Sequence, residues 1–415
     1  MTLRRVGITN LLIVLALAAL APLVVDLVPR ITIPVAVVEV LLGLFLGPQL
    51  LGVLHVDRVV NAFSDFGLAM LFFLAGVDVD VRRIRGTPLV TATLGWVLGL
   101  GAAMAVATGL YAGGLAATPQ YLALALATTA LGTLLPALAD AGQLDTGLGR
   151  SIMACGTVGE FLPIVCIALI LDPVHTHLAA VALLNLFVLV VLAAVLVARR
   201  WRPHRLVRVV RQTMHSSAQL AVRLSVLLLL ALIGLAQVFG LDVLLGAFAA
   251  GMIVAQVLGT ADPAFLESLQ EKYQGIGFGI TIPVFFVATG ARFDLAALLG
   301  SPLTLVLMVG FVALLMALRG LPSALLARRA GLVDRPVPLL LLTATSLPLV
   351  VTITNLGVQD GRMSSPVASA LVGAAMLSVL VFPATALVAL RRHNEPDAAE
   401  RSRLPAGLPG RRRGL

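Results

Sequence analysis

Runs of about twenty consecutive apolar residues recur along the whole chain, and no other feature constrains its fold as strongly. Apolar residues make up 60% of the 415 positions and charged residues 12%. Each run can cross a bilayer core roughly 30 Å thick. Inside lipid, each run has to satisfy its own backbone hydrogen bonds and is therefore expected to be a helix. The sequence predicts an all-α polytopic membrane protein.

The runs predict about thirteen transmembrane helices. Their expected ranges are 7–28, 32–53, 61–80, 88–113, 120–140, 149–172, 177–198, 219–240, 242–258, 274–292, 302–327, 336–358 and 365–390. Together they form one transmembrane domain over residues 1–392. Residues 393–415 are expected to form a short, basic, disordered cytoplasmic tail.

Arginine predicts the orientation of the chain. Six arginines lie between residues 199 and 211, and more lie in the tail. If the N-terminus is outside, most basic residues lie inside, as the positive-inside rule requires. We therefore expect a cell inner (plasma) membrane protein with a cytoplasmic C-terminus. A pI near 11 could indicate nucleic acid, but the basic residues lie in loops between spans, so membrane lipid is the expected partner. The sequence leaves a homodimer open.

Three pairs of segments match in the same order and indicate an internal repeat. They are 38–43 with 241–246, 72–76 with 285–290, and 126–131 with 342–347. One repeat period contains seven spans. Because seven is an odd number, the second copy enters the membrane from the opposite face, so the two repeats are inverted. Repeat 1 covers about 7–172, the linker span 177–198, and repeat 2 about 219–390. Inverted repeats are an architecture of secondary transporters, with the binding site near the bilayer midplane.

The fifth and twelfth spans carry hydroxyl side chains, Gly and Pro near their centres. Such residues weaken a helix and release backbone carbonyls, and irregular backbone at this depth usually lines a cavity. A pair of interrupted spans at matching places in two repeats indicates a transport site. We expect Thr128, Thr129, Thr345 and Ser346 to line it, because a partly dehydrated hard cation prefers oxygen ligands. The alternative is polar contact between packed helices.

Three ionisable residues lie within apolar spans. Glu160 is near the centre of the sixth span, where a charge costs about 2.5–3.5 kcal/mol on insertion scales, and such residues usually have a function. The alternative is a permanently protonated carboxyl. Arg319, in the eleventh span, either compensates charge inside the bundle or reaches the surface near Arg328. Glu39, in the second span, is either an additional site residue or a packing acid. Catalytic triads, phosphate loops and metal-ligand spacings are absent from the sequence, so we expect no enzyme, no cofactor and no resident metal.

Four segments give the chain a resemblance to a known family. They are residues 37–48, 70–80, 245–251 and 283–290. On the basis of these segments, the region 7–390 resembles the monovalent cation:proton antiporters of the sodium/proton exchanger superfamily. The resemblance is to the potassium-efflux and sodium/proton branch of that superfamily. The resemblance implies that spans five and twelve are unwound and cross. It also implies that positions 159 and 160 correspond to the family's acid pair, of which this chain keeps only Glu160, because Gly159 has no side chain. The family's basic residue corresponds to Arg319.

The function implied by this resemblance is exchange of Na⁺ or K⁺ for H⁺ by alternating access, with cation and proton competing for Glu160. Two other classes stay open. The same architecture also hosts organic-anion or bile-acid-like symporters, because a fold does not fix a function. The missing side chain at Gly159 keeps a third class open, a non-transporting membrane sensor.

Overall fold

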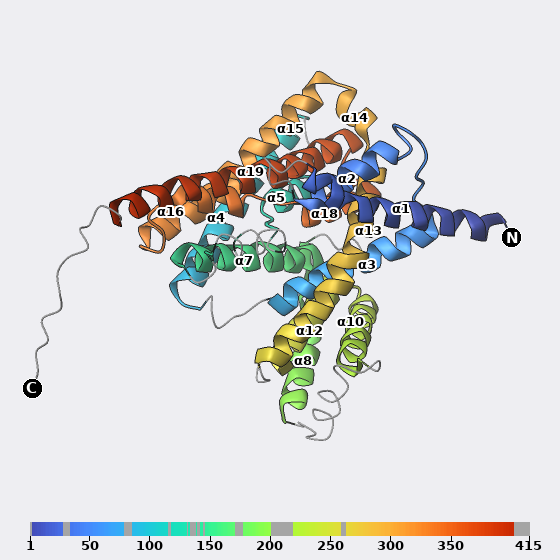
Figure 1. Ribbon diagram of the computed structural model, residues 1–415, viewed down its shortest axis with the longest axis horizontal. Coiled ribbons are helices and arrows are strands. Elements are labelled where there is room, and N and C mark those ends of the chain that lie inside the picture. The colour runs from blue at the N-terminus through green and yellow to red at the C-terminus, as the bar shows by residue number, and fades with distance from the viewer. Residues whose placement is uncertain are drawn as a thin grey trace, which may run out of the picture.

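The structure is a computed structural model that describes residues 2–27, 34–78, 85–114, 118–130, 132, 138, 142–143, 146–170, 177–200, 219–258 and 263–401. Every regular element in these ranges is a helix, which confirms the predicted all-α class (Figure 1). The helices are α1 (Thr2–Asp26), α2 (Val35–Leu46), α3 (Arg58–Asp78), α4 (Thr87–Ala112), α5 (Pro119–Leu126), α7 (Gly147–Ile170), α8 (His177–Arg200), α10 (Leu220–Val238), α11 (Val243–Leu258), α12 (Pro263–Ile276), η1 (Gly277–Thr281), α13 (Ile282–Arg292), α14 (Leu295–Leu299), α15 (Pro302–Leu314), η2 (Leu315–Gly320), α16 (Leu321–Arg329), α17 (Pro336–Thr343), α18 (Pro348–Gln359) and α19 (Ser365–Arg401).

Nine helical segments in the described ranges are long and apolar enough to cross a membrane, and three further apolar helices are shorter. These twelve coincide with twelve of the predicted spans. The fifth span begins as α5, and most of its second half lies outside the described residues. The count of thirteen therefore stays a prediction. α19 continues to Arg401, past the expected end of the membrane domain at residue 392.

Two boundaries differ from the hydropathy pattern. α2 ends at Leu46, although the expected span ran to residue 53. Pro48 restricts the residue before it to extended backbone, and Gly47 is extended with φ −64° and ψ 174°. The tenth span starts earlier than expected, because α12, η1 and α13 follow one another without interruption from Pro263.

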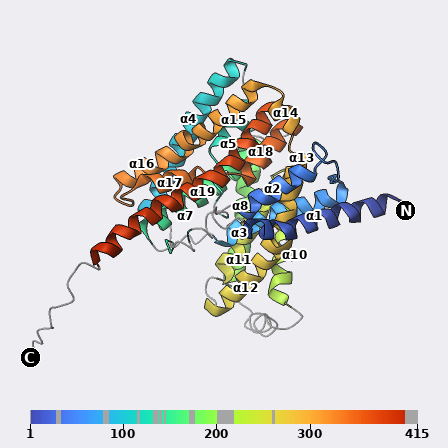
Figure 2. The same cartoon turned by 45° about the horizontal axis from the view of Figure 1, so that its top comes forward.

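The helices pack as two groups. In the first, which we call the α3 group, α1, α11, η1 and α13 pack against α3, and α2, α10 and α12 pack against these helices. In the second, the α19 group, α4, α5, α7 and α15–α18 pack with α19 and with one another. Figure 2 shows α4, α15, α16 and α19 on one side of the molecule and α1, α10, α11 and α12 on the other.

Glycines hold the α3 group together. A Cβ on Gly43 of α2 would lie 2.0 Å from the carbonyl oxygen of Val287 on α13, and a Cβ on Gly251 of α11 would lie 2.1 Å from that of Phe73 on α3. Only glycine allows such close helix contact. In the predicted repeat, α2 corresponds to α11 and α3 corresponds to α13. The α2–α13 contact in one arrangement is therefore equivalent to the α11–α3 contact in the other. The packing thus has the form that the repeat requires, and the repeat itself stays a prediction.

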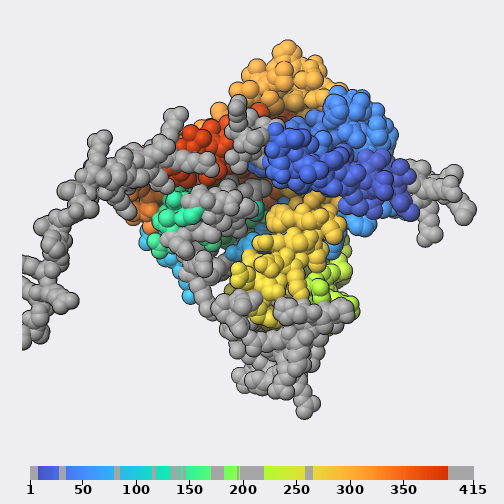
Figure 3. Space-filling view, viewed as in Figure 1, coloured from blue at the N-terminus to red at the C-terminus, as the bar shows by residue number. Residues whose placement is uncertain are grey.

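The outer surface of the molecule is apolar where α1 covers it. In the space-filling view α1 lies across the molecule beside the α12–α13 segment (Figure 3). Its side chains Ile8, Leu12 and Leu23 are each about three-fifths exposed or more. A water-soluble surface seldom gathers so many large apolar side chains. This surface is suited to lipid contact.

Candidate functional site at the crossing of two broken helices

Two interrupted helices meet inside the α19 group. The first stops at Leu126, where α5 ends, and continues as a turn and irregular backbone through Ala130. The second stops at Thr343, where α17 ends, and resumes at Pro348, where α18 begins. The N–H of Ala130 donates to the carbonyl of Thr345 at 2.9 Å. One broken segment therefore satisfies part of the free backbone of the other.

Hydroxyl side chains from both breaks meet at this crossing. The Thr128 hydroxyl donates to the carbonyl of Ala125 at 2.8 Å, and it also contacts the Ser346 hydroxyl. A hydroxyl has one proton, so Ser346 donates to Thr128. Both lone pairs of the Ser346 oxygen remain for a ligand. The Thr345 hydroxyl donates to Leu341 at 3.1 Å and likewise keeps its lone pairs.

Thr129 has a different position from the other hydroxyl residues. Its hydroxyl donates to the carbonyl of Thr343 at 2.7 Å and accepts a hydrogen bond from Arg319 Nε at 2.8 Å. Its N–H donates to the carbonyl of Gly159 at 3.1 Å. Thr129 therefore joins both broken helices, α7 and η2, and its side chain mainly holds the crossing together.

Arg319 is completely buried, at 0% exposure. It lies in η2, a π-helical turn, and such turns are frequent at functional sites. Besides Thr129, its guanidinium donates to the carbonyl of Cys155 at 2.6 Å and to the Ser323 hydroxyl at 2.8 Å. All three acceptors are neutral oxygens. The guanidinium thus brings a fixed positive charge to the crossing and ties η2 to α7.

Gly159 and Glu160 lie on α7 next to the crossing. A Cβ on Gly159 would lie 2.5 Å from Arg319 Nη2 and 2.6 Å from Thr129 Oγ1, so glycine leaves the space that these two groups occupy. Glu160 is buried, at 7% exposure. The next residue, Phe161, stacks on Phe248 of α11 at 5.3 Å between ring centroids. At the level of Glu160, α7 of the α19 group therefore contacts α11 of the α3 group.

Pro163 explains why the Gly159 carbonyl is available. In an α-helix this carbonyl would accept the N–H of the residue four positions later, but that residue is Pro163, which has no N–H. Pro163 lies inside α7. The unpaired carbonyl accepts Thr129 instead, immediately before Glu160.

Sequence reasoning missed two side chains that support the breaks. Trp96 of α4 donates from Nε1 to the carbonyl of Ala127 at 3.0 Å, where the first helix stops. Ser378 of α19 accepts the N–H of Ser346 at 3.2 Å and donates to Ala375 at 2.7 Å. A tryptophan in the middle of an apolar span was a usable signal for the first. A single serine in a span was no signal for the second.

The structure does not bring Glu39 to the crossing. Glu39 is buried at 4% exposure on α2, and α2 packs mainly against α13 and α1 in the α3 group. Of the predicted site residues, Thr128, Thr129, Gly159, Arg319, Thr345 and Ser346 are joined by the contacts described above, and Glu160 follows Gly159 directly. Within the described ranges, no three His, Cys, Asp or Glu side chains gather as they would around a resident metal ion.

Comparisons with known proteins show which family the chain resembles. Residues 15–391 match the sodium/hydrogen exchanger transmembrane family. The chain is 22% identical to YjbQ of Bacillus subtilis (strain 168). The match covers 94% of this chain and 64% of YjbQ. It is also 22% identical to the Na(+)/H(+)-K(+) antiporter GerN of Bacillus cereus, covering 86% of this chain and 90% of GerN.

A solved structure has the same fold. The sodium proton antiporter MjNhaP1 of Methanocaldococcus jannaschii superposes with a TM-score of 0.63 at 17% identity, over 94% of this chain and 96% of that one. The family match covers nearly the whole membrane region that carries the crossing. The chain therefore belongs to the sodium/hydrogen exchanger transmembrane family.

Proposed function

We propose that the chain exchanges a monovalent cation, Na⁺ or K⁺, for protons across the plasma membrane by alternating access. The observation that supports this most directly is the crossing of two broken helices beside the buried Glu160. The name of GerN includes both Na⁺ and K⁺, so either ion fits the proposal. We place the N-terminus outside and the loop 199–211 inside, from the arginine distribution.

Competition for Glu160 is the core of the proposed mechanism. A protonated Glu160 is neutral and has no net charge with which to hold a cation. Once ionised, its carboxylate binds the cation together with the hydroxyl oxygens of Ser346, Thr128 and Thr345. Arg319 and Thr129 hold the two breaks in place and bind no ion themselves.

Movement of the two helix groups would carry the site from one side of the membrane to the other. The contacts of Arg319 and Thr129 join α7, η2 and both broken helices into one unit within the α19 group. Small displacements at packed interfaces switch between discrete arrangements. In the proposed cycle, the α19 group moves against the α3 group with either a proton or a cation on Glu160.

Substitution of Glu160 tests this mechanism. We expect Glu160→Gln to reduce cation-driven proton flux in everted vesicles to the background, because the amide neither ionises nor carries the proton. Glu160→Asp keeps the carboxylate and should retain measurable exchange. The thermal unfolding midpoint of each purified variant checks that the fold is intact. Full exchange by Glu160→Gln would refute the mechanism.

The pH dependence gives a second measurement of the same competition. Below the pKa of a shared carboxylate, each unit decrease in pH should raise the apparent KM for the cation up to about tenfold, because protons displace cations one for one. The rate at saturating cation should change much less. An apparent KM that does not rise with increasing acidity at any pH where exchange is measurable would contradict competition at one group.

A further inference from the structure

Ser378 of α19 contacts both backbone polar groups of one residue in the second break. Its hydroxyl oxygen accepts the N–H of Ser346 at 3.2 Å and lies 3.2 Å from the carbonyl oxygen of the same residue. The hydroxyl has one proton, and the carbonyl of Ala375 accepts it at the shorter distance of 2.7 Å. Ser378 is completely buried, at 0% exposure. One side chain of α19 therefore fixes the backbone on both sides of the Ser346 Cα.

The backbone of Ser346 depends on this hydroxyl. α17 ends at Thr343, and the carbonyl of Leu342 accepts the N–H of Thr345 at 3.2 Å. Within the described residues no backbone carbonyl accepts the N–H of Ser346, and Ser346 is 1% exposed. A buried N–H without a partner is costly. Ser378 thus satisfies a donor that the helix break itself leaves free.

The first break is anchored from α7 in a comparable way. The N–H of Thr129 donates to the carbonyl of Gly159, which Pro163 leaves free. In the predicted repeat, α7 and α19 are corresponding spans. α19 has Val379, not proline, four residues after Ala375, so the Ala375 carbonyl already has its helical donor. A hydroxyl side chain on α19 therefore takes the place of the free carbonyl on α7.

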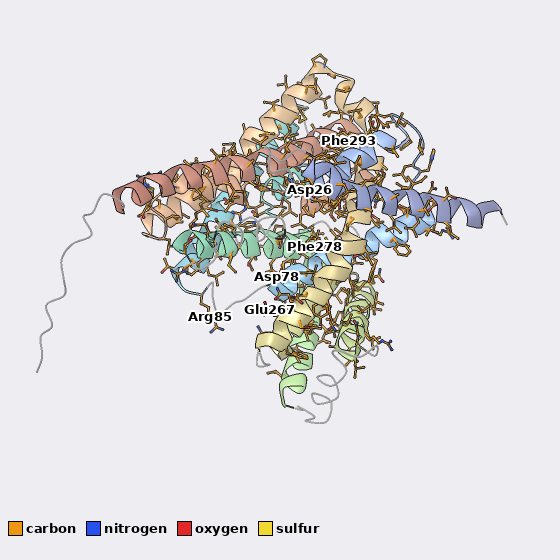
Figure 4. All side chains as sticks on the ribbon, viewed as in Figure 1. Asp26, Asp78, Arg85, Glu267, Phe278 and Phe293 are labelled. Carbon is orange, nitrogen blue, oxygen red and sulfur yellow. The ribbon has the colours of Figure 1, made fainter. Side chains whose placement is uncertain are left out.

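The two anchoring helices hold the crossing from two directions. α7 packs against α5 and α17, and α19 packs against α17 and α18. Figure 4 shows α19 above α7 in this view, and the helix contacts place the broken helices against both. α19 is therefore part of the unit that holds the site.

The residue that Ser378 anchors also supplies an oxygen of the candidate site. The Ser346 hydroxyl contacts the Thr128 hydroxyl of the first break, and both lone pairs of its oxygen remain for a ligand. The Ser346 oxygen is only two bonds from its Cα, so the backbone that Ser378 fixes largely determines where this oxygen lies.

We propose that Ser378 is a positioning residue for the cation, which it does not contact. It holds the backbone of Ser346 in the arrangement that directs the Ser346 oxygen to the ion. This inference rests on the proposed cation exchange. Without the Ser378 hydroxyl, the Ser346 N–H turns to another acceptor in the cation-free protein, and cation binding has to return it to an unpaired position. The cost falls on cation binding and not on movement of the loaded protein.

Removal of the hydroxyl tests this in everted vesicles. Ser378→Ala should raise the apparent KM for Na⁺ or K⁺ about tenfold, the effect of leaving one buried donor unpaired in the bound state, with a nearly unchanged maximal rate. Ser378→Thr keeps the hydroxyl and should restore most of the affinity. An unchanged apparent KM in Ser378→Ala would overturn the proposal.

The matched control is Ser225→Ala on α10. It removes another buried hydroxyl, which bonds the Tyr273 hydroxyl of α12 inside the α3 group. This variant loses a hydrogen bond between helices as Ser378→Ala does, and its apparent KM should stay at the wild-type value. An equal rise of the apparent KM in both variants would show that general loosening of the fold, and not positioning, is the cause.

A double-mutant cycle shows whether Ser378 acts through Ser346. Two residues that act through one contact have non-additive effects. If the Ser346 oxygen carries the effect, adding Ser378→Ala to Ser346→Ala should leave the apparent KM of the single variant Ser346→Ala unchanged. A tenfold rise in both backgrounds would show that Ser378 acts without the Ser346 side chain and would overturn the proposal.

Cation-dependent stability separates this proposal from the transport function. A cation that binds the native state raises the thermal unfolding midpoint of the purified protein. We expect Na⁺ or K⁺, compared with choline at equal ionic strength, to stabilise the wild type, and Ser378→Ala to need about tenfold more cation for the same shift.

The outcomes of the two measurements are distinct. This stability result supports the positioning role even if the wild type fails to exchange cations, in which case only the proposed function falls. Exchange by the wild type with an equal apparent KM in Ser378→Ala overturns the positioning role and leaves the function standing. A wild type that neither exchanges Na⁺ or K⁺ nor is stabilised by them overturns both.

Discussion

Gly159 determines how closely Arg319 approaches the backbone of α7. Alanine at an exposed helix position stabilises by about 0.8–1 kcal/mol relative to glycine, so propensity alone predicts that Gly159→Ala is harmless. The added Cβ would instead lie 2.5 Å from Arg319 Nη2 and 2.6 Å from Thr129 Oγ1. We expect exchange to fall at least about tenfold, because the displaced groups carry charge-assisted hydrogen bonds worth about 1.5–3 kcal/mol each.

The control for this prediction is Gly101→Ala on α4. A Cβ at Gly101 meets no atom within 4 Å, so the same chemical change there should leave cation-driven proton flux unaltered. Both variants are measured in everted vesicles at matched protein amounts. Equal flux in Gly159→Ala and wild type would show that Arg319 can adopt another position without loss.

At the same scale, some site residues could be predicted from the sequence and others could not. A glutamate, an arginine and paired hydroxyls in apolar spans stand out because burying such groups is costly. Trp96 and Ser378 act through hydrogen bonds to the backbone of other helices, and such bonds depend on tertiary position alone. The sequence favours Glu160 because it lies near the centre of its span, and it leaves Glu39 open as a site residue or a packing acid. The packing of α2 in the α3 group separates Glu39 from the crossing.

At the scale of the helix, Pro163 couples the shape of α7 to the first break. Pro163→Ala adds an N–H that can bond the Gly159 carbonyl and compete with the N–H of Thr129. Proline inside a helix costs about 3 kcal/mol, so this variant should be at least as stable as the wild type. Its exchange rate should nevertheless fall several-fold, because Thr129 loses its anchor beside Glu160.

Pro22→Ala on α1 is the matched control, because Pro22 also lies inside a helix and is exposed away from the crossing. The thermal unfolding midpoint and the proton flux are measured for both variants. If Pro163→Ala keeps or gains thermal stability while its proton flux falls, the proline acts by positioning Thr129 and not by maintaining the fold as a whole. Full flux in Pro163→Ala would show that the Gly159 carbonyl is dispensable.

The same contrast holds for the helices as elements. Hydropathy predicted nearly all of the described helices, since any helix in lipid needs a long apolar run. It overestimated α2, where Gly47 and Pro48 end the helix within an apolar stretch. The contact between the two breaks could be anticipated from the family resemblance alone, because no pattern within one span reports which other span it meets.

At the scale of the whole molecule, the distribution of buried charge predicts the stoichiometry of the proposed exchange. Among the side chains that the structure describes, the buried charged residues are Glu39, Glu160 and Arg319. The guanidinium of Arg319 stays protonated, and Glu39 lies on α2 in the α3 group. One carboxylate at the crossing can therefore carry one proton or one monovalent cation. Fixed charges around the carboxylate do not alter the net charge that one exchange cycle moves. Exchange should be one for one and electroneutral.

A clamped membrane potential measures this directly. An elementary charge moved across 100 mV is worth about 2.3 kcal/mol. If two protons were exchanged per cation, this energy would shift the final pH gradient by about 0.8 unit per 100 mV, because each proton contributes about 1.36 kcal/mol per pH unit. For one-for-one exchange we expect no shift when proteoliposomes are clamped at zero and then at −100 mV. If a shift appears in the wild type and disappears in Glu39→Gln, the second proton travels on α2, and the α3 group would then take part in the transport chemistry.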